Sequence, residues 1–472
     1  MQHADRSTLL GTTEMRRLVP KISLPIMFSM IVQALYNIVD SYYISQFDQN
    51  GLTAVSLAMP FQMLMIALST GMGTGINSLI SRRLGELRQS DARRASWNGL
   101  LIELAGSCLF IVAGLFFAGP LMNLIVDGSL KNRESILRMG TEYLSIVTIW
   151  STGLFSAIFF ERLLQSTGNS KASMAAQLCG ALTNIILDPI LIFGRLGFRP
   201  MGISGAAIAT VIGQWLSAGV GIALNQFKNE ELKLNRKDFA ICGCDIRDIV
   251  SVGLPSTIMA SIGSVMNVGM NAILSGFAEN NAALNVMSVY FKLQSFIFMP
   301  VFGLANGIIA IIGYNYGARN KKRIYQCIKV ALIWAGTIMI IGTLVFMIFP
   351  DALMSIYEKK DITDPETLLV TEQMNRIGPV AMRVICTNFI FAAVGITLST
   401  VFQAIGKGTY SMVLSICRQL VLLLPAAWLL AKITGSVYAV WWCFPIAEIA
   451  SLFICLYMFR KCNREMLAPL PG

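Results

Sequence analysis

The chain has 472 residues, of which 55% are hydrophobic and 13% are charged. This composition, with a mean hydropathy of +0.64, excludes an ordinary soluble globular domain and is typical of a polytopic membrane protein. The net charge of +11 would suit a nucleic-acid partner. No basic stripe alternates with aromatic residues, however, so we expect no nucleic-acid binding.

The first twenty residues contain several charges and no apolar core before Pro20. We therefore expect no cleaved signal peptide, and the first spanning helix should itself direct insertion. Apolar runs of about 20 residues each predict a membrane-spanning helix. Twelve such helices are predicted, at 22–46, 52–80, 95–119, 136–160, 169–194, 203–225, 247–275, 284–313, 326–349, 375–401, 409–430 and 437–459.

The loops between these helices differ in charge. Basic residues gather in alternate loops, around 82–94, 228–237, 319–323 and 460–464, whereas the opposite loops, such as 47–51 and 351–372, are short or acidic. Lysine and arginine are enriched on the cytoplasmic side of membrane proteins. The pattern predicts a multi-pass protein of the cell membrane with both termini in the cytoplasm.

The two halves of the chain repeat each other at a register of 230–238 residues. Paired positions include Leu24-Pro25 with Leu254-Pro255, Gly75 with Gly307, and Gln165 with Gln403. Duplicated halves around a central cavity are a common transporter plan. We expect an N-terminal six-helix lobe over 1–225, a cytoplasmic linker over 226–245, and a C-terminal six-helix lobe over 246–472.

Polar side chains interrupt three helices of the N-terminal half at helical spacing. They are Gln33, Asn37 and Asp40 on the first helix, Asn184 and Asp188 on the fifth, and Thr210 and Gln214 on the sixth. Carboxylates are rare inside membranes and usually face a protein-lined cavity, and oxygen ligands suit a sodium ion or a proton. Interhelical hydrogen bonding alone is the simpler explanation, but two acids without a nearby basic residue favour a cation site.

The C-terminal half lacks these acids, because the repeat places Met270 opposite Asp40 and Ala426 near Asp188. The cation site should therefore belong to the N-terminal half. Other charged residues lie in the C-terminal helices: Lys292, Arg383, Arg418 and Glu448. Arg418 and Glu448 are expected to pair, whereas the role of Lys292 stays open between membrane anchor, carbonyl partner and cavity lining.

No enzyme motif accompanies these residues. Gly71, Gly73 and Gly75 form a G-x-G-x-G that lacks a strand context, so close helix packing explains it better than nucleotide binding. Cys242 and Cys244 form a C-x-C in a loop predicted to be cytoplasmic, where disulfides are disfavoured, and the ten cysteines form no zinc-ligand cluster. His3 is the sole histidine. We therefore expect a protein that is not an enzyme.

The order of several short motifs resembles that of the multidrug and toxic compound extrusion (MATE) transporters, from Leu24-Pro25 to the twelfth predicted helix. The stretches that carry the resemblance are Gln165-x-x-Gly168-Asn169, Asn184-x-x-x-Asp188-Pro189, 205–210 and 290–296. Each is modest alone, but their order together with twelve helices is specific.

The resemblance implies an all-α fold of two six-helix lobes in a V, and export of organic compounds in exchange for sodium ions or protons. The residues that match the family's N-lobe cation site are Asp40, Asn184, Asp188 and Thr210, so the coupling ion, a sodium ion or a proton, is expected to bind there. Some members carry a second acidic pair in the C-lobe. This chain has Gly263 near one of those positions, which argues against a second site.

We therefore expect an antiporter that exports amphipathic, cationic organic compounds, with small organic substrates and the lipid bilayer as its partners. No cofactor is expected beyond the coupling ion, and the protein should act as a monomer. Gln33, Asn37, Gln214 and Lys292 are expected to line the substrate cavity. The alternative is a lipid-linked precursor flippase of the same wider superfamily, whose members often have extra helices and cationic cavities.

Overall fold

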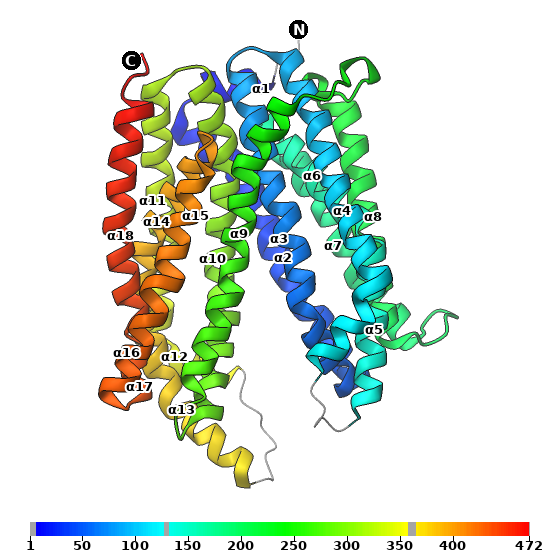
Figure 1. The fold of residues 1–472 in the computed structure, drawn as a ribbon, viewed down its shortest axis with the longest axis vertical. Helices are drawn as coiled ribbons and strands as arrows, with labels where there is room; N and C mark the ends of the chain where they lie inside the picture. Colours follow the sequence, from blue (N-terminus) through cyan, green and yellow to red (C-terminus); the bar gives the residue numbers. More distant parts are fainter. Residues whose placement is uncertain (1–5, 127–131, 357–364, 472) are drawn as a thin grey trace.

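Long helices make up the fold, because within a bilayer each backbone N–H must find its partner inside its own segment. The computed structural model describes residues 6–126, 132–356 and 365–471, so His3 lies outside the described residues. The helices run side by side along the longest axis of the molecule (Figure 1).

The N-terminal half begins with a short helix, α1 (Arg6–Thr12), followed by six membrane-spanning segments. These are α2 (Met15–Phe47), α3 (Gln49–Gly85), α4 (Gln89–Ile125), the bent pair α5 (Arg133–Ile149) and α6 (Thr152–Ser166), α7 (Ser170–Phe193) and α8 (Gly202–Lys228). The linker to the second half holds two short 3₁₀ turns, η1 (Glu230–Leu232) and η2 (Arg236–Asp238).

The C-terminal half repeats this plan with more breaks. Its helices are α9 (Gly243–Leu274), α10 (Asn280–Gly317), α11 (Lys321–Ile348), α12 (Pro350–Ser355), α13 (Pro365–Ile385), α14 (Phe389–Ala404), α15 (Gly408–Ile416), α16 (Leu424–Thr434), α17 (Val437–Val440) and α18 (Cys443–Cys462). The turn η3 (Cys386–Asn388) joins α13 to α14, the π-helical segment η4 (Cys417–Leu423) joins α15 to α16, and η5 (Asn463–Leu467) follows α18.

Within the described residues, eleven segments are long and apolar enough to cross a membrane, and the α5–α6 pair, bent by 46°, supplies a twelfth. The predicted twelve helices are thus confirmed. Their ends extend beyond the predicted ranges: α13, for example, begins at Pro365 rather than at residue 375. Hydropathy underestimates such ends because charged residues continue a helix outside the hydrocarbon layer.

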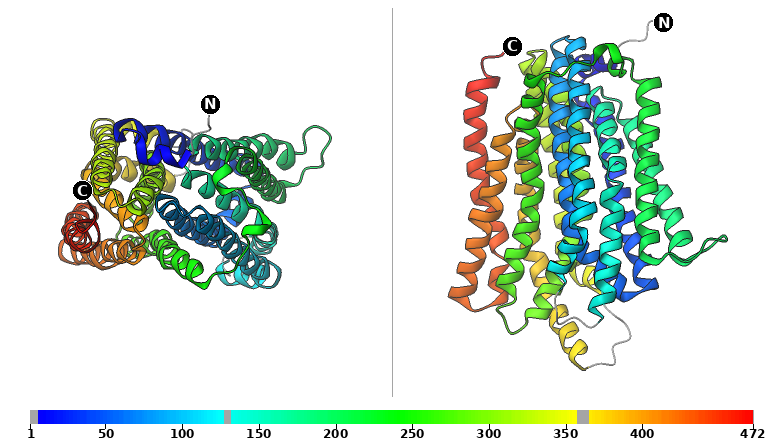
Figure 2. Two further views of the ribbon diagram at one scale, coloured as in Figure 1. Left: turned by 90° about the horizontal axis from the view of Figure 1, so that it is seen from above. Right: turned by 45° about the vertical axis from the view of Figure 1, so that its right-hand side comes forward.

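The two halves form separate lobes that make a V. They approach each other at the end that holds both termini and diverge at the opposite end (Figure 1), and a turned view shows the same grouping (Figure 2). The expected two-lobe architecture is therefore present.

The lobes touch through a pair of contacts related by the repeat. Gly71 of α3 lies against α9, where a Cβ atom would come within 2.8 Å of Thr257 Cα, and Gly303 of α10 lies against α2, where a Cβ atom would come within 2.6 Å of Met27 Cα. Both positions require glycine, since any side chain would force the helices apart. The glycine motif therefore serves close helix packing.

Hydrogen bonds connect the two lobes at the end that holds the termini. Ser78 Oγ of α3 donates to the carbonyl oxygens of Gln403 (2.7 Å) and Ala404 (3.1 Å) at the end of α14. Asn315 Nδ2 of α10 donates to the carbonyl oxygen of Leu10 at 3.0 Å. The lobes diverge at the opposite end of the V. These hydrogen bonds between the lobes therefore lie at the end that holds the termini.

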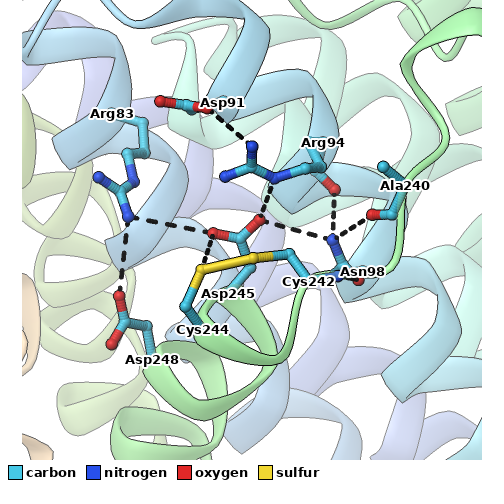
Figure 3. Close-up of a disulfide and its surroundings, with 9 residues drawn as sticks. All are labelled: Arg83, Asp91, Arg94, Asn98, Ala240, Cys242, Cys244, Asp245 and Asp248. Carbon is cyan, nitrogen blue, oxygen red and sulfur yellow. Dashed lines mark hydrogen bonds and ion pairs between the residues drawn. A yellow bond between two sulfur atoms is a disulfide. The ribbon is translucent and has the colours of Figure 1, made fainter.

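A buried acid ties the start of α9 to the N-terminal lobe. Asp245 is fully buried, and its Oδ2 accepts from Arg94 Nε of α4 at 2.9 Å (Figure 3). Arg83 lies 4.0 Å from the same carboxylate, and Asn98 Nδ2 is 3.5 Å away. These residues form what we call the Asp245 lock.

Cys242 and Cys244 lie beside the lock and are joined by a disulfide (Figure 3). This pairing differs from the expectation that both would remain reduced packing cysteines, and the C-x-C spacing at the start of a helix is what brings the two sulfurs together. With Asp245 they lie within metal-ligand distance of one another. The bonded sulfurs offer no thiolate and Asp245 is already neutralised by Arg94, so this group is a poor metal site.

Candidate functional site

Three of the four predicted cation-site residues are in direct contact within the N-terminal lobe. Asn184 and Asp188, one turn apart on α7, and Thr210 on α8 are all buried. When the Asn184 amide nitrogen donates to Asp188 Oδ2 at 3.3 Å, its oxygen accepts from the Thr210 hydroxyl and backbone N–H, both at 3.2 Å. The close packing of α7 on α8, through Gly180 and Gly213, makes this contact possible.

Asp40 lies on α2, which packs against α7. Its charge and that of Asp188 act on each other and on Tyr36. Asp40 Oδ1 is buried without a hydrogen-bond donor among the described residues. We call Asp40, Asn184, Asp188 and Thr210 the N-lobe acid cluster.

Further oxygen atoms near the cluster also lack donors. Gln177 Nε2 donates to Gln33 Oε1 at 3.3 Å. Among the described residues, Gln177 Oε1 and Gln214 Oε1 are both buried without a hydrogen-bond partner. Buried acceptors without donors are costly unless a cation or a proton satisfies them. The donor set, two carboxylates with neutral oxygens, fits a sodium ion or a proton.

A cavity lies elsewhere, between the lobes. It has a volume of about 630 Å³ and is lined mainly by α9, α10, α14, η4 and α18, with Met30, Thr70, Thr74 and Arg162 from the N-terminal lobe. Its wall is rich in methionine and phenylalanine, and its size is that of a typical site for a small organic ligand. The charged residues in its wall are Arg162, Arg418 and Glu448.

The residues expected to line a cavity fall outside this wall. Gln33 and Gln214 lie partly buried near the N-lobe acid cluster, whereas Asn37 and Lys292 are exposed. None of the four is among the residues that line the 630 Å³ cavity, and neither are Asp40 and Asp188. The acid cluster and the large cavity are therefore two separate places in this conformation.

The expected ion pair of the C-terminal lobe is present. Arg418, in the π-helical segment η4, donates Nη1 to Glu448 Oε1 of α18 at 3.4 Å. Arg383, by contrast, lies 3.7 Å from Asp351, and both of these side chains are exposed. Arg418 and Glu448 thus belong to the cavity wall, whereas Arg383 belongs to the surface.

A second buried charged group was missed by sequence reasoning. Glu103 of α4 accepts from Ser69 Oγ at 2.8 Å, and its other oxygen has no partner among the described residues. On α6, Arg162 donates to Gln165 Oε1 at 3.0 Å, and Gln165 Nε2 donates to Glu161 Oε1 at 2.9 Å. Glu103 lies inside the predicted helix 95–119, so the rule that singled out Asp40 would also have found it.

A V of two repeat-related lobes, a buried acid cluster and an amphipathic cavity between the lobes define a polytopic membrane transporter rather than an enzyme. The profile of the MatE family matches residues 25–190 and 255–429. Because this match covers most of the chain and both lobes, the chain belongs to the MatE family.

Individual relatives extend over nearly the whole chain. The multidrug export protein MepA of Staphylococcus haemolyticus is 24% identical over 446 residues, 94% of this chain and 93% of MepA. The probable multidrug resistance protein NorM of Thermotoga maritima is 23% identical over 424 residues, 89% of this chain and 86% of NorM. A solved MATE structure in complex with MaL6 is similar with a TM-score of 0.88, at 23% identity over 98% of this chain and 99% of that one.

Proposed function

We propose that the chain is a secondary active exporter of amphipathic organic compounds, driven by the entry of sodium ions or protons. The names of its relatives MepA and NorM, a multidrug export protein and a probable multidrug resistance protein, support this role. The single observation that carries it is the separation of two sites: an acid cluster with unsatisfied oxygens, and an apolar cavity of about 630 Å³.

Asp40, Asn184, Asp188 and Thr210 would bind the coupling ion. Asp40 and Asp188 sit on different helices, α2 and α7, and their negative charges repel each other. A bound cation or proton removes that repulsion and allows the two helices to approach. Coupling requires the ion-loaded and ion-free lobes to differ in their affinity for the exported compound, so a movement of α2, which contributes Met30 to the cavity wall, would link the two sites.

The sequence predicts a cationic substrate. Glu448 is the carboxylate that could meet its positive charge inside the cavity, because Asp40 and Asp188 are absent from the wall. The methionine and phenylalanine side chains of the wall can adapt to several apolar shapes, which supports broad selectivity. We further propose that the protein works as a monomer in the cell membrane with both termini in the cytoplasm.

The alternative, a lipid-linked precursor flippase, draws support from one observation: two of the three charged residues in the cavity wall are arginines, which suit a pyrophosphate group. A flippase would move a fluorescent isoprenoid pyrophosphate between leaflets without an ion gradient. The N-lobe acid cluster has no evident use in that reaction.

The test is transport by the purified protein in liposomes. When a sodium or pH gradient is imposed, ethidium should cross the liposome membrane in the direction opposite to the flow of sodium ions or protons. Asp188→Asn should abolish this gradient-driven movement. Asp351→Asn is the matched control, because Asp351 is an exposed acid near the surface Arg383. Equal ethidium movement with and without any gradient, or normal driven transport by both Asp40→Asn and Asp188→Asn, would contradict the proposal.

A further inference from the structure

The C-terminal lobe presents a charged pair to the cavity from an unusual segment of helix. Arg418 lies in η4 (Cys417–Leu423), a π-helical stretch between α15 and α16, just before Pro425. π-helical turns are rare and occur frequently at functional sites. This segment is therefore a candidate for ligand contact rather than for packing alone.

Arg418 has unused hydrogen-bonding capacity. Among the described residues, the Arg418 side chain donates one hydrogen bond, from Nη1 to Glu448 Oε1 at 3.4 Å. A guanidinium carries five N–H donors in a planar fork, and a strong arginine–carboxylate pair is usually shorter and bidentate. The side chains of Arg418 and Glu448 keep 24% and 11% of their surface exposed, and both line the cavity.

Small residues leave room beside this pair. A Cβ atom at Gly395 of α14 would come within 3.6 Å of Glu448 Oε1, and a Cβ atom at Gly263 of α9 would lie 3.9 Å from Gln419 Oε1. A Cβ atom at either position would make only ordinary contact, so no side chain of α9 or α14 covers the carboxylate or the amide at these points, and both line the cavity. We call Arg418, Gln419 and Glu448 the C-lobe subsite.

Of the charged groups in the wall, Arg418 is the one that can bind an anionic group. Arg162 and Arg418 are positive and Glu448 is negative, while the acids of the N-lobe cluster stand outside the wall. The charge of Arg162 is balanced by the buried acids Glu103 and Glu161, so Arg418 is the cation of the wall that a ligand can engage. In a cavity of low dielectric constant, its attraction for an anion is stronger than in water. The geometry and specificity of a guanidinium suit a carboxylate in particular.

We propose that the C-lobe subsite binds a carboxylate group of the exported compound. Arg418 exchanges its long contact with Glu448 for a bidentate contact with the ligand carboxylate. The aromatic side chains of the cavity wall contact the apolar part of the compound. Glu448, released from Arg418, can then accept a donor such as an amine on the same compound. The inference rests on the proposed function, because it takes the 630 Å³ cavity to be the substrate site, and it adds an acidic group to the cationic compound expected above.

The test compares pyrenebutyrate with its methyl ester, two probes with the same aromatic body that differ in charge. Binding to the purified full chain in detergent is followed by fluorescence polarisation. The acid should bind more tightly than the ester, and Arg418→Gln should weaken acid binding by about 10- to 100-fold, the range for a hydrogen bond to a charged group, with little effect on the ester. Arg418→Lys keeps the positive charge but cannot make a bidentate contact. Its affinity for the acid should lie between those of the unmodified protein and of Arg418→Gln.

Glu448→Gln gives a prediction of opposite sign. It removes the internal competitor for Arg418, so pyrenebutyrate affinity should rise by about 10-fold while ethidium affinity falls. This variant keeps the test decisive if Arg418→Gln does not fold, which a thermal unfolding measurement will reveal. Arg383→Gln, which removes an exposed arginine outside the cavity, is the matched control and should change neither affinity.

The outcomes separate this inference from the proposed function. If acid and ester bind equally, or if the acid preference survives Arg418→Gln and is unchanged by Glu448→Gln, the carboxylate subsite is overturned while the exporter proposal stands. If acid, ester and ethidium all fail to bind, the cavity is not the substrate site and the proposed function itself is contradicted. Arg418-dependent binding of an isoprenoid pyrophosphate in preference to pyrenebutyrate would also overturn the carboxylate assignment and favour the flippase.

Discussion

Substitution of Asp245 by asparagine should loosen the end of the molecule that holds both termini. Asp245 is fully buried and accepts from Arg94 Nε at 2.9 Å, so α9 of one lobe is bonded to α4 of the other. For the lobes to part at this end, that contact must break. Asp245→Asn removes the charge while keeping the size of the side chain, so it weakens the lock without opening a cavity.

The free-energy cost of Asp245→Asn depends on the partners that Arg94 keeps. Removing one member of a fully buried ion pair costs about 3–5 kcal/mol, because the other charge is left uncompensated. Here Arg94 also lies 3.0 Å from Asp91 and is 29% exposed, so its charge stays partly compensated. We therefore expect a loss of about 1.5–3 kcal/mol, the value of a hydrogen bond to a charged group. The population of the form open at this end should rise by roughly 10- to 100-fold.

The assay is cysteine accessibility from the side of the termini. Thr74→Cys places a thiol in the cavity wall, in a chain whose eight free cysteines are replaced. Labelling of position 74 by an impermeant maleimide should become faster by roughly the same factor when Asp245→Asn is added.

The control is Asp248→Asn, only three residues away. Asp248 is 45% exposed and lies 3.9 Å from Arg83, and a long ion pair whose acid is exposed to solvent contributes about 0–1 kcal/mol. This substitution should leave the labelling rate nearly unchanged. Equal rates for Asp245→Asn, Asp248→Asn and the parent would refute the reasoning, because they would show that the buried pair does not hold the lobes together.

Three further outcomes are expected. Cysteines placed at the exposed Asn235 and Thr434 should react with an impermeant maleimide from opposite sides of the membrane, since the two residues lie at opposite ends of the helical bundle. Gly75→Val should prevent the lobes from closing and abolish transport, because a Cβ atom there would meet the backbone of α9, including Gly253 N at 3.0 Å. Arg162→Gln should lower the thermal unfolding temperature, because the buried acids near Arg162 lose their compensating charge, at a cost of about 3–5 kcal/mol.

Each of these has a matched control or a contradicting result. Labelling of both cysteines from one side would overturn the assigned topology. Gly219→Ala introduces a Cβ atom into open space and should preserve transport, so equal damage by both glycine variants would remove the packing argument. Arg383→Gln removes an exposed arginine, and a fall in unfolding temperature equal to that of Arg162→Gln would show that burial of the charge is not the cause.

Hydropathy predicted the helices well, because an apolar run of sufficient length has one stable form in a bilayer. Helix ends were less accurate: the charged start of α13 continues the helix outside the hydrocarbon layer, where hydropathy carries no signal. The π-helical form of η4 was also absent from the prediction, since it depends on packing around residues 417–423.

The candidate site was predicted in part. Helical spacing brought Asn184 and Asp188 onto one face, and the structure adds the hydrogen bonds between Asn184 and Thr210. The sequence could not indicate that Asp40 and Asp188 stand outside the wall of the large cavity, because the direction of a polar face depends on how the lobes pack. Glu103 was missed for a simpler reason, since the search for buried acids stopped at the polar stripes.

The measurement that tests the central claim most directly is the affinity of the purified protein for ethidium across sodium concentration and pH. If the N-lobe acid cluster and the cavity are coupled, sodium or protons should weaken ethidium binding, and ethidium should weaken ion binding by the same factor, as linkage requires. The dependence should disappear in Asp40→Asn and Asp188→Asn while ethidium still binds. Ethidium affinity that is indifferent to sodium and to pH in the unmodified protein would contradict the account.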